Sequence, residues 1–159
     1  MNPLPSSADA REALLAAAIA STDDGVVVID WDSRIALFNT GAERIFGWSE
    51  VDILGQPLER LIPLASRARH AALLSEFARG HQDSRRMNER QDIMALRRDG
   101  TEFPVAVSIT RVHLEGATFF VAIVRDVSAR YYAAEMLAAK TRQLETITTA
   151  GGGTSAEVR

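Results

Sequence analysis

Two hairpin signals in the second half of the chain constrain its fold most strongly. Asp99-Gly100 and Glu115-Gly116 each interrupt an extended, largely apolar pattern. Pairs of this kind supply the positive φ angles of a type I′ turn, which joins neighbouring antiparallel strands. We therefore expect the three segments that they separate to pair in one antiparallel sheet. These segments are residues 88–97, 102–113 and 117–126.

Two further strands are predicted in the first quarter of the chain. GVVVID at residues 25–30 and IALF at residues 35–38 flank the turn WDSR. The later stretch FPVAVSI alternates with period two, and FFVAIV is continuously apolar, as expected of a central strand. One face of FPVAVSI carries Phe103, Val105, Val107 and Ile109. The five strands indicate an α+β fold with an antiparallel sheet and helices on one of its faces.

Helices are predicted between the second and third strands. Asn39 caps a short helix that Gly47 ends, and Ser49 starts another that Gly55 ends. RARHAALLSEF, residues 67–77, then forms a longer amphipathic helix.

One ionisable residue lies on the apolar face of this longer helix. His70, Leu73, Leu74 and Phe77 follow the i, i+3, i+4, i+7 spacing, which directs the imidazole toward the core. Such a histidine is either a ligand to a group held in the core or a ring hydrogen-bonded to the backbone. Both interpretations stay open.

Both ends of the chain lie outside the predicted core domain of residues 22–126. Residues 1–8 are rich in Pro and Ser and are predicted to be a disordered tail, and the glycine-rich residues 148–159 a flexible one. Residues 9–21 and 127–147 are predicted to be flanking helices, each with one apolar side. These sides carry Leu14, Leu15 and Ile19 in the first helix, and Leu137, Leu144 and Ile147 in the second.

The second flanking helix allows two interpretations. Its apolar residues form a two-heptad seam that Lys140 interrupts. The helix either packs back on the sheet or forms a coiled coil that carries the output signal.

The composition excludes several classes of function. The 159 residues include no cysteine, which rules out disulfides and thiolate sites and favours a reducing compartment. A net charge of -3 provides no basic field, so no direct nucleic-acid partner is expected. ALLAAAIA, residues 13–20, is too short to span a bilayer and lacks the basic flank of a signal peptide. We expect a cytoplasmic protein without a membrane partner.

No catalytic site is predicted. A nucleophile, a base and an orienting group must converge in a cleft, but His70, His81 and His113 fall in a helix, a polar loop and a hairpin tip. The sequence contains no phosphate-binding loop, dinucleotide fingerprint or zinc-protease motif. We expect no enzymatic activity, so binding and signal relay remain.

Three stretches in the expected order resemble the signatures of a PAS sensor domain with its C-terminal extension. They are DGVVVID…RIALFNTGAERIFGWSEVDILGQPLERLIP, RRDGTEFPVAVSI and FFVAIVRDVSAR. The resemblance covers about residues 13–130 and implies a sensory and dimerisation module of bacterial two-component signalling. Such a module binds a small ligand or cofactor in its core and relays its state to the C-terminal helix. A ligand-free protein–protein interaction domain is one alternative.

The resemblance leaves the cofactor unknown. Because the chain has no cysteine, a covalent cysteinyl chromophore of the light-sensing or yellow-protein branches is excluded. Haem b, noncovalently bound flavin, a metabolite and an empty core remain.

A haem-based gas or redox sensor is the second alternative. His70, Leu74 and Phe77 are similar to the helix pattern of haem PAS oxygen sensors, in which the histidine is the axial metal ligand. Those sensors carry a distal arginine or methionine where this chain has Gln91, and Arg90 and Met94 are out of phase with that position. The implied cofactor-binding set is His70, Leu74, Phe77, Gln91, Val107 and Ile109.

The resemblance also implies how a signal leaves the domain. Asp126 and Arg130 are expected to be i, i+4 neighbours at the start of the last helix. The family uses such a pair to tie the last strand to the signalling helix. The implied partners are a second copy of the chain and a downstream effector domain or histidine kinase.

We predict a homodimer, because the apolar sides of the two flanking helices are more surface than one small sheet can cover. Light scattering at micromolar concentration should give the mass of two chains. Leu137→Asp places a charge in the seam and should shift the protein toward monomers. A monomeric wild type whose size and stability do not change in Leu137→Asp would refute the dimer.

Overall fold

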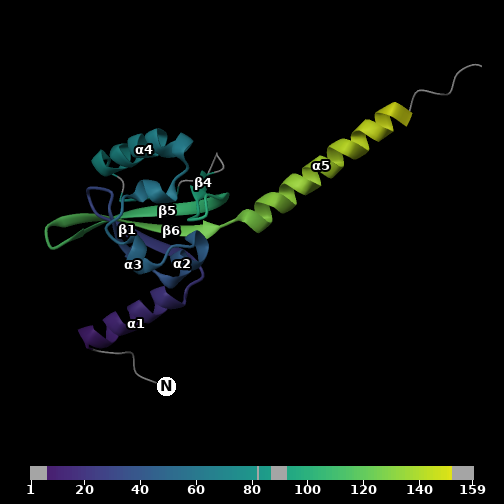
Figure 1. The fold of residues 1–159 in the computed structure, drawn as a ribbon. Coiled ribbons are helices and arrows are strands. Elements are labelled where there is room, and N and C mark those ends of the chain that lie inside the picture. Colours follow the sequence, from purple (N-terminus) through teal and green to yellow (C-terminus); the bar gives the residue numbers. More distant parts are fainter. Residues whose placement is uncertain (1–6, 82, 87–92, 152–159) are drawn as a thin grey trace, which may run out of the picture. The chain divides into compact units, whose positions relative to one another are not determined.

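The computed structural model describes residues 7–81, 83–86 and 93–151. Contacts divide the chain into two compact units, one ending at Asp126 and one beginning at Val127. The first unit contains the sheet, and the second consists mainly of one helix, α5 (Figure 1).

The helices and strands follow one another in the order that the sequence predicts, with one additional strand. The helices are α1 (Ala8–Ser21), α2 (Thr40–Phe46), α3 (Glu50–Ile53), α4 (Arg67–Arg79) and α5 (Ser128–Gly151), with the 3₁₀ turns η1 (Leu58–Leu61) and η2 (Leu64–Ser66). The strands are β1 (Gly25–Ile29), β2 (Ile35–Phe38), β3 (Ser84–Arg86), β4 (Ile93–Leu96), β5 (Glu102–Leu114) and β6 (Ala117–Asp126).

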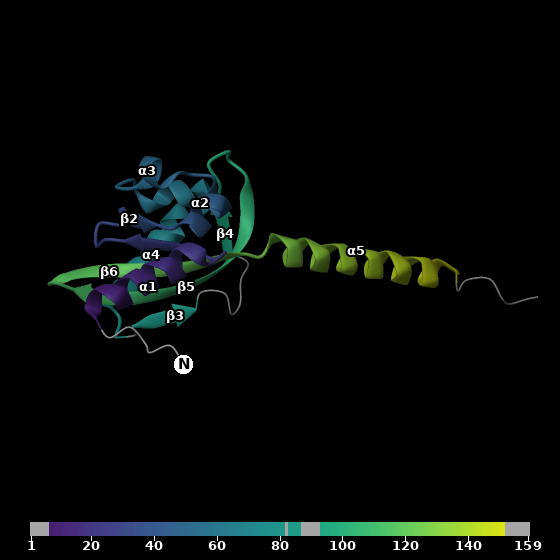
Figure 2. The same cartoon turned by 90° about the horizontal axis from the view of Figure 1, so that it is seen from below.

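The strands form one antiparallel sheet in which β6 is central. The order is β2-β1-β6-β5, and the free edge of β5 pairs with β4 near its start and with β3 farther along. Figure 2 shows β3 beside β5. The sheet therefore has five strand positions, and the predicted α+β fold is confirmed. The strand β3 is too short and polar to produce a detectable sequence pattern.

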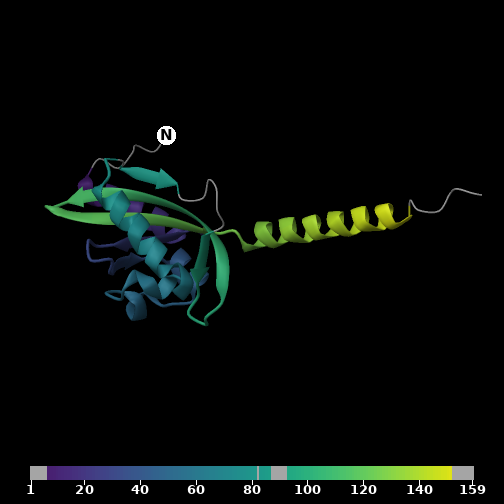
Figure 3. The same ribbon diagram turned by 90° about the horizontal axis from the view of Figure 1, so that it is seen from above.

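The inner face of the sheet supplies most of the core. Phe103, Val105 and Ile109 are buried on β5, as the period-two pattern predicts. Helix α4 crosses this face (Figure 3), and α1 lies on the other side of β5 and β6 (Figures 1 and 2). At the end of the sheet near β4, the rings of Phe38 and Phe103 pack around Phe46, with ring centroids 5.9 and 5.7 Å from it.

The turn at Asp99-Gly100 differs from the predicted type I′ turn. Of this pair only Gly100 has a positive φ, of 88°. The N–H of Gly100 donates to the Arg97 carbonyl at 3.0 Å, and the N–H of Arg97 donates to the Thr101 carbonyl at 2.9 Å. The loop is thus a type I turn followed by a left-handed glycine. The prediction was wrong because the Asp99 carboxylate accepts the Thr101 N–H at 2.8 Å, which stabilises a turn that begins one residue earlier.

The second hairpin turn has the predicted geometry. Glu115 and Gly116 have φ angles of 49° and 80°, and Leu114 pairs directly with Ala117. Both central residues therefore lie in the left-handed region, as a type I′ turn requires.

The side chain of Asn39 joins four backbone segments. Its Oδ1 accepts the N–H of Ala42 at 2.9 Å, which caps α2, and the N–H of Val26 in β1 at 2.7 Å. Its Nδ2 donates to the carbonyls of Ile19 at 2.8 Å and Asp24 at 3.2 Å. The predicted cap therefore also connects α1 and β1 to α2.

The flanking helices present their predicted apolar residues to solvent. Helix α1 has no buried residue. The side chains of Leu14, Leu15, Ile19, Leu137, Leu144 and Ile147 are all exposed. Helix α5 continues to Gly151, past the predicted end at residue 147, and the hydroxyls of Thr146 and Thr148 donate to carbonyls one turn earlier. Within the described residues, no helix has both the length and the apolar character that crossing a membrane requires.

Asn39→Ala should lower the free energy of unfolding by about 2–4 kcal/mol, because buried backbone groups lose their partners. Ser49→Ala is the matched control. Ser49 also caps a helix, but its bond to Asp52 is 3.3 Å long and exposed, so we expect a loss of about 1 kcal/mol or less. Urea denaturation of the three proteins measures both values. Equal losses in the two variants would contradict the role assigned to Asn39.

Candidate functional site

A large cavity lies between α4 and the inner face of the sheet. Its volume is about 950 Å³, within the range of cavities that hold small-molecule ligands. The sheet side is formed by apolar residues of β1, β5 and β6, among them Val27, Val107, Ile109, Phe120, Ala122 and Val124. This main cavity can accommodate an apolar ligand.

Most of the predicted cofactor-binding residues meet in this main cavity. His70, Leu74, Val107 and Ile109 line it. Phe77 instead packs in the core, with its ring centroid 6.1 Å from that of Phe120. Gln91 and Arg90 lie outside the described residues.

The register of β4 agrees with the predicted phase of Met94. Ile93 and Ala95 pair with Val105 and Phe103 of the inner face, whereas Met94 between them pairs with Pro104. Side chains alternate between the two faces of a sheet, so Met94 is out of phase with the inner face. All three residues of β4 border the main cavity.

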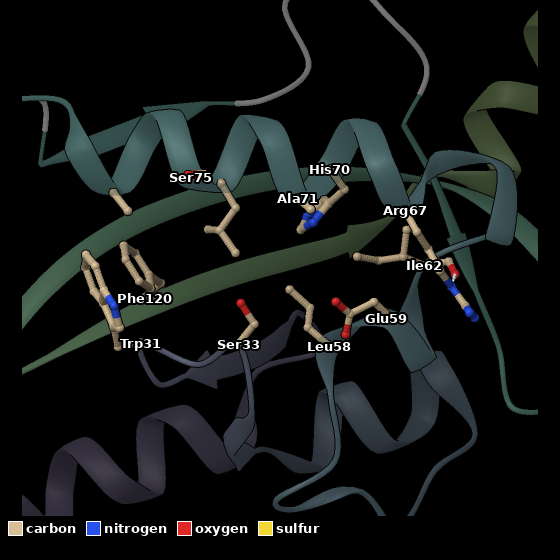
Figure 4. A pocket seen from close by; sticks show the side chains of 12 residues that line it. Trp31, Ser33, Leu58, Glu59, Ile62, Arg67, His70, Ala71, Ser75 and Phe120 are labelled. Atoms are coloured by element: carbon tan, nitrogen blue, oxygen red, sulfur yellow. Dashed lines mark hydrogen bonds between the residues drawn. The ribbon is translucent and has the colours of Figure 1, made fainter.

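A second, smaller cavity of about 200 Å³ adjoins the main one. The two share five lining residues, which are Leu58, Ile62, His70, Leu74 and Phe120. We call the smaller one the vestibule. Figure 4 shows it between α4 above and the β1–β2 turn and η1 below, with the side chains of Ser33 and Glu59 directed into it.

The imidazole of His70 is half-buried at the boundary of the two cavities. Burial lowers its pKa below the ordinary value of 6.5, and the nearby carboxylate of Glu59 acts weakly in the opposite direction. The ring is therefore neutral at neutral pH. Among the residues that the structure describes, His70 has no hydrogen-bond partner. Of the two interpretations of His70, the structure thus lends no support to a ring satisfied by the backbone.

Arg111 fixes the C-terminal end of α4 to the sheet. Its Nη1 donates to the carbonyls of Ala78 at 3.0 Å and Gly80 at 2.9 Å, and its Nη2 pairs with Asp83 at 3.0 Å. Helix carbonyls near a C-terminus lack partners within the helix, so a cation stabilises them. The role of Arg111 was not predicted from the sequence, because its hydrogen-bond partners are close to it only in the folded chain.

The ion pair that the structure shows for Asp126 is with Arg97, at 2.7 Å. Asp126 is the last residue of β6, not a residue of the final helix as predicted, because its backbone still pairs with Val105 of β5. The Arg97 guanidinium also lies 3.7 Å from the ring centroid of Phe103 and donates to the carbonyl of Ile45. Arg97 thus connects α2, β5 and the end of β6. Arg130 lies in the first turn of α5.

The comparisons identify the fold class. Residues 13–127 match the model of the PAS fold. The chain therefore belongs to the PAS family, whose domains are sensor modules of signalling proteins and are not themselves catalytic.

The relatives include larger sensor proteins. The chain is 36% identical over 118 residues to the sensor protein FixL of Bradyrhizobium diazoefficiens, a match that covers 74% of this chain and 23% of FixL. It is 26% identical over 120 residues to the oxygen sensor protein DosP of Escherichia coli, which covers 76% of this chain and 14% of DosP. The chain thus spans less than a quarter of either relative. A PAS domain from Colwellia psychrerythraea superposes with a TM-score of 0.64 at 22% identity, covering 75% of this chain and 98% of that one.

His70 should make the protein less stable as the pH falls through 6.5, the ordinary pKa of histidine, toward the lower folded-state pKa of this residue. Because burial lowers the folded-state pKa of His70 below 6.5, the unfolded chain binds the proton first. The stability that this residue contributes is full above that range and is lost on acidification. His70→Gln should flatten the curve of urea midpoint against pH. Since all other titrating groups are common to both proteins, parallel curves would contradict the assignment.

Proposed function

We propose that this chain is the sensory and dimerisation module of a signalling protein, which binds a small ligand in the main cavity and relays its presence to α5. The observation that supports this proposal is the cavity of about 950 Å³, lined by the inner face of the sheet. A concave, largely apolar site of this size is typical of places where proteins bind small molecules. A domain used for protein interaction alone would have no need of it.

Strand β6 is the proposed path of the signal. Phe120, Ala122 and Val124 form part of the cavity wall, and the same strand ends at Asp126, two residues before α5 begins. A ligand that displaces this wall would change the strain on the ion pair between Asp126 and Arg97. Arg130 in the first turn of α5 is the proposed receiver of that change.

The proposed partners are a second copy of the chain and a downstream kinase or effector. The exposed apolar residues of α1 and α5 are available to a second copy. FixL and DosP are sensor proteins of which the matching segment is a small part. By analogy, the sensor would act on a module elsewhere in a longer chain or on another chain.

Haem is the second candidate ligand, and His70 favours it. A neutral imidazole with no protein partner in the described chain borders the cavity and can act as an axial ligand. Leu74, Val107 and Ile109 would pack against the apolar macrocycle. When bound, haem would supply an iron that binds a diatomic gas.

Ala122→Phe should abolish ligand uptake. Ala122 lies at the centre of the inner face, opposite Val27 and Ile109, and a phenyl ring there fills part of the main cavity. Native mass spectrometry of the purified wild type should show a co-purified small molecule, or uptake of an added hydrophobic dye, and the variant should show neither. Ile123→Phe, on the exposed outer face of the same strand, should behave as wild type. Identical uptake by wild type and Ala122→Phe would contradict the proposal.

His70→Ala separates the two ligand candidates. For a ligand other than haem, we expect no Soret band in the wild type after reconstitution with haem, and a loss of about 1–3 kcal/mol of stability in the variant. An absorption spectrum and a urea titration measure these outcomes. One haem per wild-type chain, lost in His70→Ala, would replace the first candidate by haem.

A further inference from the structure

Three polar side chains from three separate elements converge on the vestibule. They are Ser33 in the β1–β2 turn, Glu59 in η1 and His70 in α4 (Figure 4). All three are half-buried, and none has a side-chain hydrogen bond or ion pair to the described part of the protein. Half-buried polar groups bond either to the protein or to water. These three face one cavity without a partner in the described protein, so a ligand that carries several donors can replace the water there.

The hydrogen-bonding character of the three groups is complementary to an ammonium ion. A primary ammonium carries three donors and no acceptor. The carboxylate of Glu59, the hydroxyl of Ser33 and the unprotonated nitrogen of a neutral His70 ring are all acceptors. An ammonium therefore carries one donor for each of the three acceptors, whereas neither a carboxylate nor an apolar group carries any.

The carboxylate of Glu59 and a nearby aromatic ring are the features of the vestibule that favour a cation. Arg67 lines the same cavity, but its Nε donates to the carbonyl of Ile62 at 3.2 Å, and no ion pair joins it to Glu59 in the described residues. The indole of Trp31 is 60% exposed, so its face is accessible for a cation–π contact. Glu59 thus has no ion-pair partner among the described residues and lies beside an available aromatic ring.

The remaining walls determine what the ammonium is attached to. Leu58, Leu74 and Phe120 line both the vestibule and the main cavity. A short apolar stem attached to the ammonium would contact these side chains and extend into the main cavity. The volume of about 200 Å³ allows a small organic group in the vestibule itself.

We propose that the vestibule recognises the ammonium group of a small organic amine whose apolar stem extends into the main cavity. Glu59 supplies the charge, and Ser33 and His70 complete the hydrogen bonding. The inference rests on the proposed function, because it specifies the class of ligand that the sensor detects. An ammonium bonded to His70 excludes simultaneous ligation of a haem iron by His70, since both bonds need the same nitrogen lone pair.

Matched probes test the preference for charge. Isothermal titration of the full chain with 2-phenylethylamine, 2-phenylethanol and 3-phenylpropionate compares a cation, a neutral molecule and an anion on similar stems. The amine should bind about tenfold more tightly than the alcohol, and the carboxylate least tightly. Equal affinity for amine and alcohol, or no binding of the amine, would overturn the inference.

Substitutions locate the binding. Glu59→Gln keeps a hydrogen-bond acceptor but removes the charge, and it should abolish the preference for the amine over the alcohol. Glu135→Gln, an exposed carboxylate of α5, should retain it. Urea midpoints confirm that both variants are folded. Trp31→Phe should eliminate the change of tryptophan fluorescence on adding the amine. A preference that persists in Glu59→Gln would overturn the inference.

The outcomes separate this inference from the proposed function. If wild type takes up the hydrophobic dye and Ala122→Phe does not, the main cavity is a ligand site regardless of the affinity measured for the amine. Equal binding of amine and alcohol in that protein would then refute the inference alone. If Ala122→Phe and wild type take up the dye equally, the proposed function fails.

Discussion

The pairing of β1 with β6 is the constraint on which the rest of the domain depends. It joins residues about a hundred positions apart, with Val27 opposite Ala122, and it closes the sheet around its central strand. The Arg125 guanidinium holds the same end through two bonds to the Asp24 carboxylate, of 2.9 and 2.7 Å, and this contact lowers the pKa of Asp24. Without this pairing neither the inner face nor the cavity above it would exist.

The cavity persists because its helical roof is supported at its ends rather than along its length. Arg111 fixes the C-terminal end of α4 by its bonds to Ala78 and Gly80. Near the other end, Arg67 donates to the carbonyl of Ile62, which directly follows η1. Between these supports only Leu74 and Phe77 of α4 are buried. A sensor needs this arrangement, since a helix packed along its whole length would leave no space for a ligand.

Much of the domain could be predicted from local signals. The caps at Asn39 and Ser49, the alternation in β5 and the turn at Glu115-Gly116 each depend on residues close in sequence, and the structure contains all of them. The turn at Asp99-Gly100 was misassigned because the bond from Thr101 to the Asp99 carboxylate competes with the type I′ geometry. The phase of Met94 in β4 follows the predicted alternation, since it pairs with Pro104 while Ile93 and Ala95 pair with inner-face residues.

The sequence by itself determined most of the elements, the antiparallel pairing of strands joined by tight turns and the apolar face on which His70 lies, because hydrophobic periodicity and turn chemistry act over a few residues. Only the tertiary structure decided which polar groups meet. Ser33, Glu59 and His70 come from a turn, a 3₁₀ segment and a helix, and nothing local links their positions. The same holds for Arg97 and Asp126, which are 29 residues apart. Their contact follows from the packing of the hairpin β4–β5 beside β6, and such long-range geometry leaves no periodic trace in a single sequence.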